Sequence, residues 1–125
     1  MLLQFNPFPE LRSEGLILEQ LSSRHIPKLF DYFKNKENFP YSEIQVHESI
    51  EETQAYVDKM NTGVRNNQWI IWAICLNNTH EIIGTISIWN FDNKKAQGEL
   101  GYGLHPSYRG QGYMMEALNN VIKYA

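Results

Sequence analysis

Apolar residues recur along the chain at two spacings, and these spacings predict strands and helices in turn. Short apolar runs at 15–21, 68–76, 81–90 and 98–104 are typical of strands. The run QWIIWAICL at 68–76 is apolar on both faces, which predicts a central strand, and the turn NNTH after it predicts a hairpin with 81–90. Gly84 inside the next run indicates a bulge or a close packing contact.

Three other segments have helical spacing. Segments 22–35 and 48–60 each place apolar residues on one side, and Gly63 is expected to end the second as its C-cap. A last helix is expected over 110–125. Its expected core positions are Met115, Leu118, Val121 or Ile122, and Ala125. This order of elements predicts one α+β domain over residues 1–125, with helices flanking a mostly antiparallel sheet.

Composition places the chain among globular proteins and narrows its partners. Of 125 residues 42% are apolar and 20% charged, and the net charge is -3. No basic run occurs, which argues against nucleic acid and membrane surfaces as partners. Residues 1–15 suggest an extended arm without the features of a signal peptide, and no apolar stretch approaches the ~18 residues that span a bilayer. The single cysteine, Cys75, fits a small buried hydrophobe in a reducing compartment, so we expect a cytoplasmic protein.

A glycine-rich turn lies where the strand at 98–104 leads into the last helix. Gly110 and Gly112 flank Gln111, and glycines at such a point let backbone N–H groups approach a ligand. The first amides of a helix have no internal partners and carry partial positive charge, so a phosphate or pyrophosphate is the expected ligand, with Arg109 adding a full charge. The alternative is that the glycines only shape a tight turn and that Arg109 is solvated.

Two common phosphate-binding loops do not match this turn. A Walker loop requires a Gly-Lys pair, and the chain has none. A dinucleotide fingerprint requires a third glycine at position 115, which is Met115, and it belongs to a parallel βαβ unit. A phosphorylated ligand would therefore be held by a loop of another kind.

The segment GTISIWN followed by GELGYGLHPSYRGQGYMMEALNNVIKYA resembles the GNAT superfamily of N-acetyltransferases, and specifically its RimJ/RimL-like branch. Proteins of that branch read E-L-G-Y-x-L-x-P-x-x-x-G-x-G-Y-x-x-E-A-L at this point. FPELRSEGLILEQLS, QWIIWAI and EIIGTISI are similar to the branch's opening, second and third strands. The resemblance covers essentially the whole chain and implies a GNAT-like acyl-CoA N-acyltransferase fold.

The resemblance also implies acetyl-CoA as cosubstrate and a primary amine as acceptor. No metal is expected, because the four histidines have no metal-ligand spacing. In the superfamily the glycine turn holds the pyrophosphate and the preceding strand pairs with the pantetheine arm. Matched residue by residue, the coenzyme-binding set is Tyr102, Gly103, Leu104, Arg109, Gly110, Gln111, Gly112, Tyr113 and Met114. Two positions depart from the pattern: Ser107 stands where glutamine or arginine is general, and Met114 stands where a small residue is usual and is expected to crowd the phosphate.

Acetyl transfer requires a neutral amine, and an α-amine with a pKa near 8 is about a tenth neutral at pH 7. Glu99, on the strand beside the pantetheine groove, is the candidate general base, as relatives often have a glutamate in this strand. The alternative is an ion pair of Glu99 with Lys94 or Lys95. A backbone N–H near Tyr102 or Gly103 would stabilise the oxyanion. In relatives a tyrosine on a later helix commonly serves as general acid, so no acid is assigned here.

In the family another strand, a helix and a hairpin follow this last helix, so we expect the domain to be C-terminally incomplete. Three interpretations stay open. The protein is an N-acetyltransferase acting on a primary amine, for which a protein N-terminal α-amine, as in RimJ/RimL relatives, is one candidate. Otherwise it is a non-catalytic CoA-binding or partner-dependent fragment, whose strand at 98–104 is an exposed edge open to pairing, for instance in a homodimer. The third interpretation is that the natural protein continues.

Overall fold

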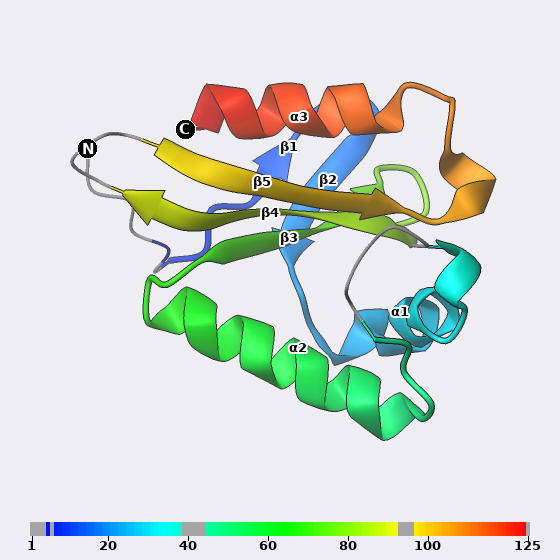
Figure 1. Ribbon diagram of the computed structural model, residues 1–125. Coiled ribbons are helices and arrows are strands. Elements are labelled where there is room, and N and C mark those ends of the chain that lie inside the picture. Colours follow the sequence, from blue (N-terminus) through cyan, green and yellow to red (C-terminus); the bar gives the residue numbers. More distant parts are fainter. Residues whose placement is uncertain (1–4, 6, 39–44, 93–96, 125) are drawn as a thin grey trace.

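The computed structural model describes residue 5 and residues 7–38, 45–92 and 97–124 (Figure 1). Within them, β1 spans Leu11–Arg12, β2 Leu16–Gln20, α1 Ile26–Phe33, α2 Ile50–Arg65, β3 Ile70–Leu76, β4 Ile82–Asp92, β5 Gln97–Leu104 and α3 Tyr113–Tyr124. Three short 3-10 turns are η1 at Ser23–His25, η2 at Lys36–Asn38 and η3 at Pro106–Tyr108.

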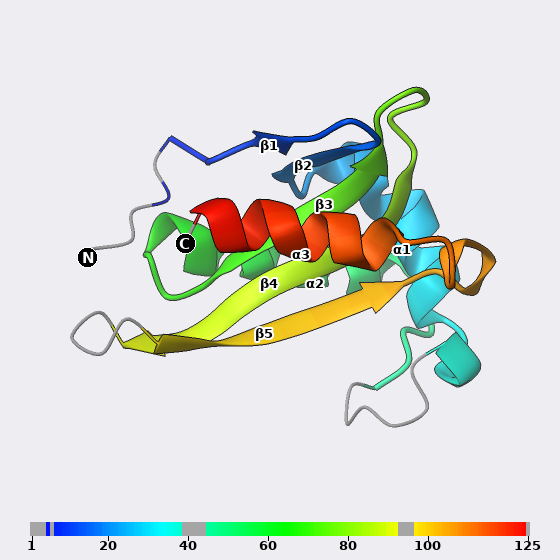
Figure 2. The ribbon, with the colours of Figure 1, turned by 90° about the horizontal axis from the view of Figure 1, so that it is seen from above.

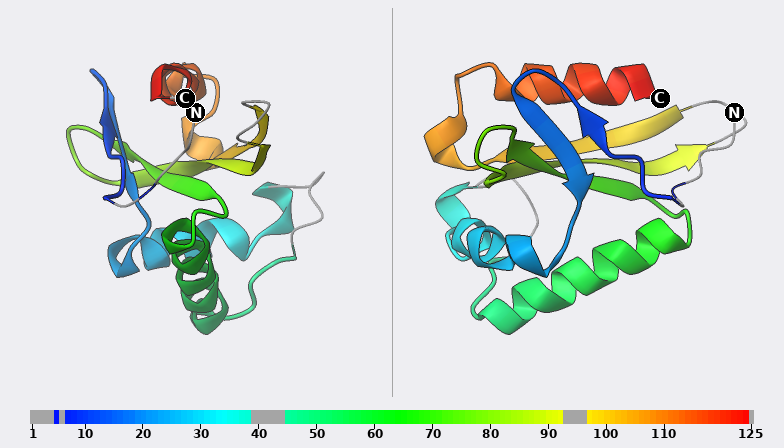
Figure 3. Two further views of the ribbon diagram at one scale, coloured as in Figure 1. Left: turned by 90° about the vertical axis from the view of Figure 1, so that its left-hand side faces the viewer. Right: turned by 180° about the vertical axis from the view of Figure 1, so that it is seen from behind.

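The five strands form one sheet in the order β1-β2-β3-β4-β5, and every neighbouring pair is antiparallel. Helix α3 lies over one face of the sheet, and α1 and α2 lie under the other (Figures 1 and 3). Seen from above, α3 runs along the sheet with β2 on one side and β5 on the other (Figure 2). The predicted α+β class is confirmed. None of the described helices is long and apolar enough to cross a membrane.

Strand β3 forms the centre of the hydrophobic core, as its sequence predicts. Its first six residues are all buried, because α3 covers one face and the α1–α2 layer covers the other. Trp72 is fully buried, and its Nε1 donates a hydrogen bond to the carbonyl of Pro9 at 2.8 Å. This bond fixes the segment that leads into β1, a strand the sequence pattern does not reveal.

Helix α2 continues to Arg65, so the prediction that Gly63 caps its end is wrong. Gly63 is buried inside the helix, where a Cβ atom would clash with the indole of Trp69. That indole also donates from Nε1 to the Met60 carbonyl at 3.0 Å. The glycine is therefore needed for side-chain packing, and the chain leaves the helix at Asn67, which adopts a positive φ of 56°.

Helix α3 begins at Tyr113, three residues later than predicted, and its buried face agrees with the predicted one in part. Val121 is buried and Leu118 packs against the core, as predicted. Ala117 and Val121 are its buried residues, whereas Met115 is 62% exposed and Ile122 64% exposed. Met115 is thus wrongly predicted as core, and Ala125 lies outside the described residues. The sequence carries two overlapping apolar rows at helical spacing, and only packing on the sheet selects one of them.

A carboxylate on α3 ties this helix to the turn between β1 and β2. Glu116 accepts hydrogen bonds from the hydroxyl of Ser13 and from the backbone N–H of Gly15, the latter at 2.8 Å. An acidic residue in the first helical turn also favours the helix dipole. Glu116 therefore orients the first turn of α3.

Gly84 allows β4 and β5 to approach closely beside the end of β5. A Cβ atom at Gly84 would clash with the carbonyl oxygen of Gly103, and the register between β3 and β4 shifts after Ile74. The prediction of a bulge or a close contact at Gly84 is confirmed.

Replacement of Gly84 by alanine is expected to destabilise the protein by about 1–3 kcal/mol, since backbone has to move to admit the methyl group. Gly101→Ala in β5 is the matched control, because its Cβ would meet side-chain atoms of Ser87, at 2.9 Å, and Trp89, at 3.2 Å, and no backbone atom. Urea unfolding measures both. A loss for Gly84→Ala no larger than for Gly101→Ala would contradict the close contact.

Candidate functional site

The glycine turn between η3 and α3 is built on two left-handed residues. Gly110 has a φ of 76° and Gly112 a φ of 83°, values that L side chains rarely adopt. No heavy atom lies within 4 Å of a Cβ built on either residue. The turn is therefore shaped by glycine geometry and is open on its outer side.

Most amide groups of this turn are without acceptors. Among the described residues, no hydrogen bond is made by the backbone N–H groups of residues 110–114. The Arg109 N–H, in contrast, already donates to the Pro106 carbonyl at 3.3 Å. Five consecutive donors thus precede or open α3, whose dipole adds partial positive charge. This arrangement suits an anion.

The side chain of Arg109 takes a position that the sequence does not predict. Its Nε donates to the Leu104 carbonyl at 3.1 Å, and its Nη2 donates to the Asn38 carbonyl. The guanidinium therefore connects the turn to η2. Met114 packs against the hydrophobic core, which accommodates the bulk expected to crowd the turn.

Strand β5 presents an edge with no strand partner in the described part of the chain. Tyr102 is 64% exposed on the face of the sheet that carries α3, and Leu104 on the same face is buried. Gly103 points to the opposite face, where its Cβ would lie 2.7 Å from the Tyr32 hydroxyl. The three predicted pantetheine partners therefore lie together on one open edge.

Glu99 lies at the other end of β5 from the glycine turn. It is exposed and pairs in register with Trp89 on β4. Five residues of extended chain separate Glu99 from Leu104, which corresponds to about 17 Å. Lys94 and Lys95, its alternative ion-pair partners, lie outside the described residues. The predicted base and the predicted pantetheine partners thus lie along β5, and the predicted pyrophosphate residues follow it in the turn.

A cavity of about 150 Å³ lies between α1 and the adjoining ends of β4 and β5. Its walls include Leu29, Tyr32, Phe33, Gly84, Gly103 and His105. Gly103 belongs both to this cavity and to the predicted pantetheine edge. No sequence spacing indicates the cavity, because α1 and β5 are brought together only by folding.

His105 has two roles at the end of β5. Its Nδ1 accepts from the Ser107 N–H at 3.3 Å, which caps η3, as a turn residue would. Its Nε2 lies 3.3 Å from Oδ2 of Asp31 on α1. The hydrogen bond of Lys34 is the main cause that lowers the pKa of Asp31, and His105 contributes to the shift. The turn therefore also contacts α1.

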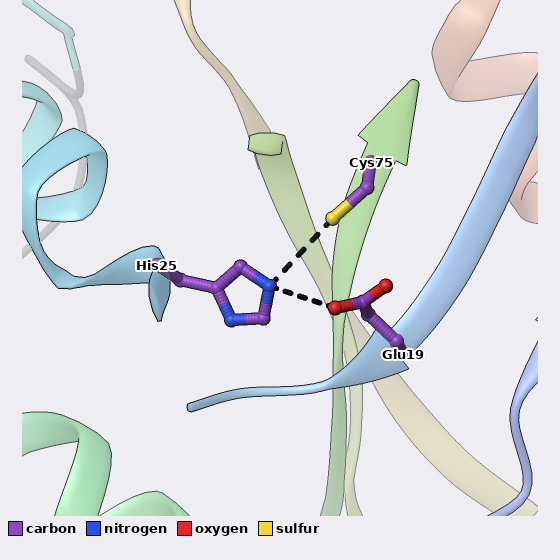
Figure 4. A group of neighbouring side chains, drawn as sticks. All are labelled: Glu19, His25 and Cys75. Atoms are coloured by element: carbon purple, nitrogen blue, oxygen red, sulfur yellow. Dashed lines mark hydrogen bonds and ion pairs between the residues drawn. The ribbon is translucent and has the colours of Figure 1, made fainter. Parts of the chain in front are cut away.

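Glu19, His25 and Cys75 form a second cluster of titratable side chains, away from the glycine turn (Figure 4). The His25 Nε2 lies 3.0 Å from a Glu19 carboxylate oxygen and 3.7 Å from the Cys75 sulfur. The His25 Nδ1 accepts from the Ser22 N–H at 3.0 Å, and a backbone N–H can only donate. The ring proton therefore sits on Nε2 and is donated to Glu19. This bonding joins β2, η1 and β3 and leaves neither ring nitrogen a free lone pair for a metal ion.

Burial dominates the titration of this cluster. It raises the pKa of Cys75 to about 12, which suits the predicted buried thiol. It also lowers the pKa of His25, with the nearby Arg24 charge acting in the same direction. Burial therefore disfavours both the imidazolium of His25 and the thiolate of Cys75, while Glu19 forms an ion pair with Arg24.

Comparison with known proteins places the chain in the acetyltransferase (GNAT) domain family, to which it belongs over residues 15–125. The chain is 29% identical over 117 residues to the uncharacterized N-acetyltransferase YoaA of Bacillus subtilis, covering 94% of this chain and 66% of the relative. It therefore spans just under two thirds of that relative's length.

Solved structures share the fold. An acetyl transferase of Salmonella typhimurium, described as modifying the N-terminal serine of ribosomal protein L7/L12, is 25% identical with a TM-score of 0.80. That match covers 93% of this chain and 67% of the other. RimL, a ribosomal L7/L12 alpha-N-protein acetyltransferase in complex with coenzyme A, is 21% identical with a TM-score of 0.78, over 93% and 67% of the two chains. The resemblance to the GNAT superfamily and the GNAT acyltransferase fold are confirmed.

The depressed pKa of His25 predicts that acidification destabilises the protein. Unfolded histidine titrates near 6.5, so the unfolded chain takes up the proton first as the pH falls. The contribution of His25 to the free energy of unfolding is complete above about pH 6.5. It is lost as the pH falls from there through the folded pKa, at up to about 1.4 kcal/mol per pH unit. Urea unfolding at pH 7.5 and 5.5 measures it.

His25→Gln should lower stability at pH 7.5 and reduce the difference between the two pH values. The exposed His80, replaced by asparagine to suit its positive φ, is the control and should leave the pH dependence unchanged. If the pH dependence of the free energy of unfolding is unchanged in His25→Gln, His25 is not its cause.

Proposed function

We propose that this protein is an acetyl-CoA-dependent N-acetyltransferase that transfers an acetyl group to a primary amine. One observation carries the proposal: the five amides of residues 110–114 have no acceptor in the described chain and lie at the start of α3. Membership of the GNAT domain family and likeness to a fold that binds coenzyme A in RimL support it.

In this proposal the backbone of the glycine turn holds the pyrophosphate, through Gly110, Gln111, Gly112, Tyr113 and Met114. Such a group needs no side-chain cation, because the turn itself supplies donors and a dipole. The open edge of β5 at residues 102–104 would receive the pantetheine arm by main-chain hydrogen bonding. The Leu104 carbonyl already accepts from Arg109, so the coenzyme would share that oxygen or displace the guanidinium.

Acetyl-CoA supplies an activated acetyl thioester, and the chain's own task is to deprotonate and orient the amine. Glu99 is the proposed proton acceptor, because it stands on β5 at the end remote from the turn. A ligand held by its phosphates at the turn and extended along β5 would bring its far end toward this carboxylate. A backbone N–H near Tyr102 or Gly103 would stabilise the negative charge on the thioester oxygen.

The proposed acceptor is the α-amine of a protein N-terminus. The Salmonella typhimurium neighbour is described as acting on an N-terminal serine, and RimL as an alpha-N-protein acetyltransferase. An α-amine is also easier to deprotonate near pH 7 than a lysine side chain. A reducing compartment, as in the cytoplasm, suits the buried thiol of Cys75.

A second candidate is a CoA-binding module that works with a partner chain. Exposed apolar side chains lie on β5 and α3, beside the open strand edge: Leu100, Tyr102, Met115 and Ile122. An unpaired edge next to apolar surface favours strand pairing with another chain, including a second copy of this one. Such a module would bind coenzyme A without acetylating an amine by itself.

Calorimetric titration with coenzyme A tests whether the unpaired amides of residues 110–114 form the proposed coenzyme site. Gly112→Ala should weaken binding by about tenfold, because a left-handed φ costs an alanine about 1–2 kcal/mol. Gly112→Asn is the matched control and should bind more tightly than the alanine variant, since asparagine tolerates positive φ. Absence of binding by the unaltered chain at millimolar coenzyme A would refute the site.

Glu99→Gln tests the proposed base with acetyl-CoA and a short synthetic peptide that begins with serine. Release of the coenzyme thiol should slow by about 100-fold or more, while coenzyme A affinity stays unchanged. Glu51→Gln, in the first turn of α2, is a charge-matched control expected to keep full rate. An unaltered rate in Glu99→Gln would exclude Glu99 as the base, and binding without turnover in the unaltered chain would favour the module.

A further inference from the structure

The segment from the end of β5 to the glycine turn is joined to the α1–η2 side by two polar contacts. Arg109 donates from Nη2 to the Asn38 carbonyl in η2, and His105 contacts Asp31 on α1 at 3.3 Å. These contacts join residues that are 71 and 74 positions apart in sequence. They link the proposed phosphate-binding turn to a part of the fold that the sequence places far from it.

Arg109 is held at both ends of this link. Its Nε bonds to the Leu104 carbonyl at 3.1 Å, so the guanidinium is fixed to the end of β5 as well as to η2. A planar guanidinium with several fixed donors can join two carbonyls in this way, whereas a lysine ammonium is a single point charge. The protons in these two hydrogen bonds, on Nε and Nη2, are directed at the Leu104 and Asn38 carbonyls and not at the open side of the turn.

The residue that Arg109 holds is itself bonded to the cavity wall. Asn38 donates from Nδ2 to the Tyr32 carbonyl at 2.8 Å, and the Tyr32 hydroxyl lies 3.4 Å from the Asn38 carbonyl. Burial raises the pKa of Tyr32, and the neighbouring Arg109 guanidinium opposes that rise. Arg109, Asn38 and Tyr32 therefore form one connected group.

Tyr32 and Gly103 both line the 150 Å³ cavity, and the Tyr32 hydroxyl would lie 2.7 Å from a Cβ built on Gly103. Gly103 is also one of the residues on the open edge of β5. Arg109 and Asn38 thereby connect the glycine turn to the Tyr32 wall of the cavity. A ligand that moved the turn would therefore also affect the cavity wall, through Arg109, Asn38 and Tyr32.

We propose that Arg109 is a positioning residue that transmits the occupancy of the glycine turn to the Tyr32 wall of the cavity. The proposal rests on the proposed function for its first ligand, coenzyme A. The wall of the cavity would then respond to occupancy of the glycine turn. Coupling of this kind requires that one element has different contacts in the free and bound states, and in this proposal the Arg109 bonds to Leu104 and Asn38 are the contacts that change.

Amide NMR of the 14.6 kDa chain tests this, with Arg109→Gln, Arg109→Lys and, as a control for loss of a surface cation, Arg12→Gln. Without ligand, Arg109→Gln should shift the backbone and side-chain amide signals of Asn38 and the amide of Tyr32. Arg109→Lys should restore part of that shift, and Arg12→Gln should leave these signals in place. Unmoved Asn38 and Tyr32 signals in Arg109→Gln would overturn the positioning role.

Coenzyme A is then titrated into each variant. In the unaltered chain, signals of Asn38 and Tyr32 should move with the same midpoint as those of residues 110–114. In Arg109→Gln the turn signals should still move on addition of coenzyme A, while the signals of Asn38 and Tyr32 no longer respond.

Two results would overturn the coupling in distinguishable ways. A loss of coenzyme A affinity above tenfold in Arg109→Gln that shrinks as salt is raised would make Arg109 a direct phosphate ligand. Failure of the unaltered chain to bind coenzyme A would remove both the coupling and the proposed function, while the ligand-free spectra would still decide whether Arg109 positions η2.

Discussion

The first turn of an α-helix has more backbone donors than it can satisfy, and at the start of α3 no acceptor in the described part of the chain pairs with the donors of residues 110–114. Two glycines with left-handed φ carry the chain from η3 into α3 without placing a side chain over the amides. Glu116, one turn further on, bonds to the turn between β1 and β2 and so holds the helix start in place. The candidate anion site therefore depends on a bend that is rigid and yet unpaired, a combination that few residue types other than glycine allow.

The other features of the candidate site lie along strand β5. Its outer edge is open among the described strands, its far end carries Glu99, and its near end enters the glycine turn. At the near end, Gly84 and Gly103 place no side chain between the sheet and α1, and the cavity lies there. The proposed coenzyme groove would lie along the edge of β5, and the cavity lies on the face of β5 that α1 covers.

Local features of the site could be predicted from sequence, and the features made by folding could not. The turn at Gly110 and Gly112 is encoded in neighbouring residues, as is the buried strand β3, so both are visible in the chain. Gly63 resembles a helix cap until Trp69 packs against it. Arg109 is predicted as a coenzyme-binding residue, and its contact with the carbonyl of Asn38 in η2, some 70 residues earlier in the chain, is not visible in the sequence. Where a residue type can serve two roles, tertiary contacts bear on which one it serves, and sequence spacing does not reveal those contacts.

Cys75 gives this fold a native reporter of its own opening. It is the one cysteine in the sequence, and it lies fully buried in the central strand β3, beneath the contact between Glu19 and His25. A thiol reagent can reach a fully buried sulfur only when the surrounding structure opens. The rate of modification therefore reports how often this part of the fold opens, with no label introduced into the chain.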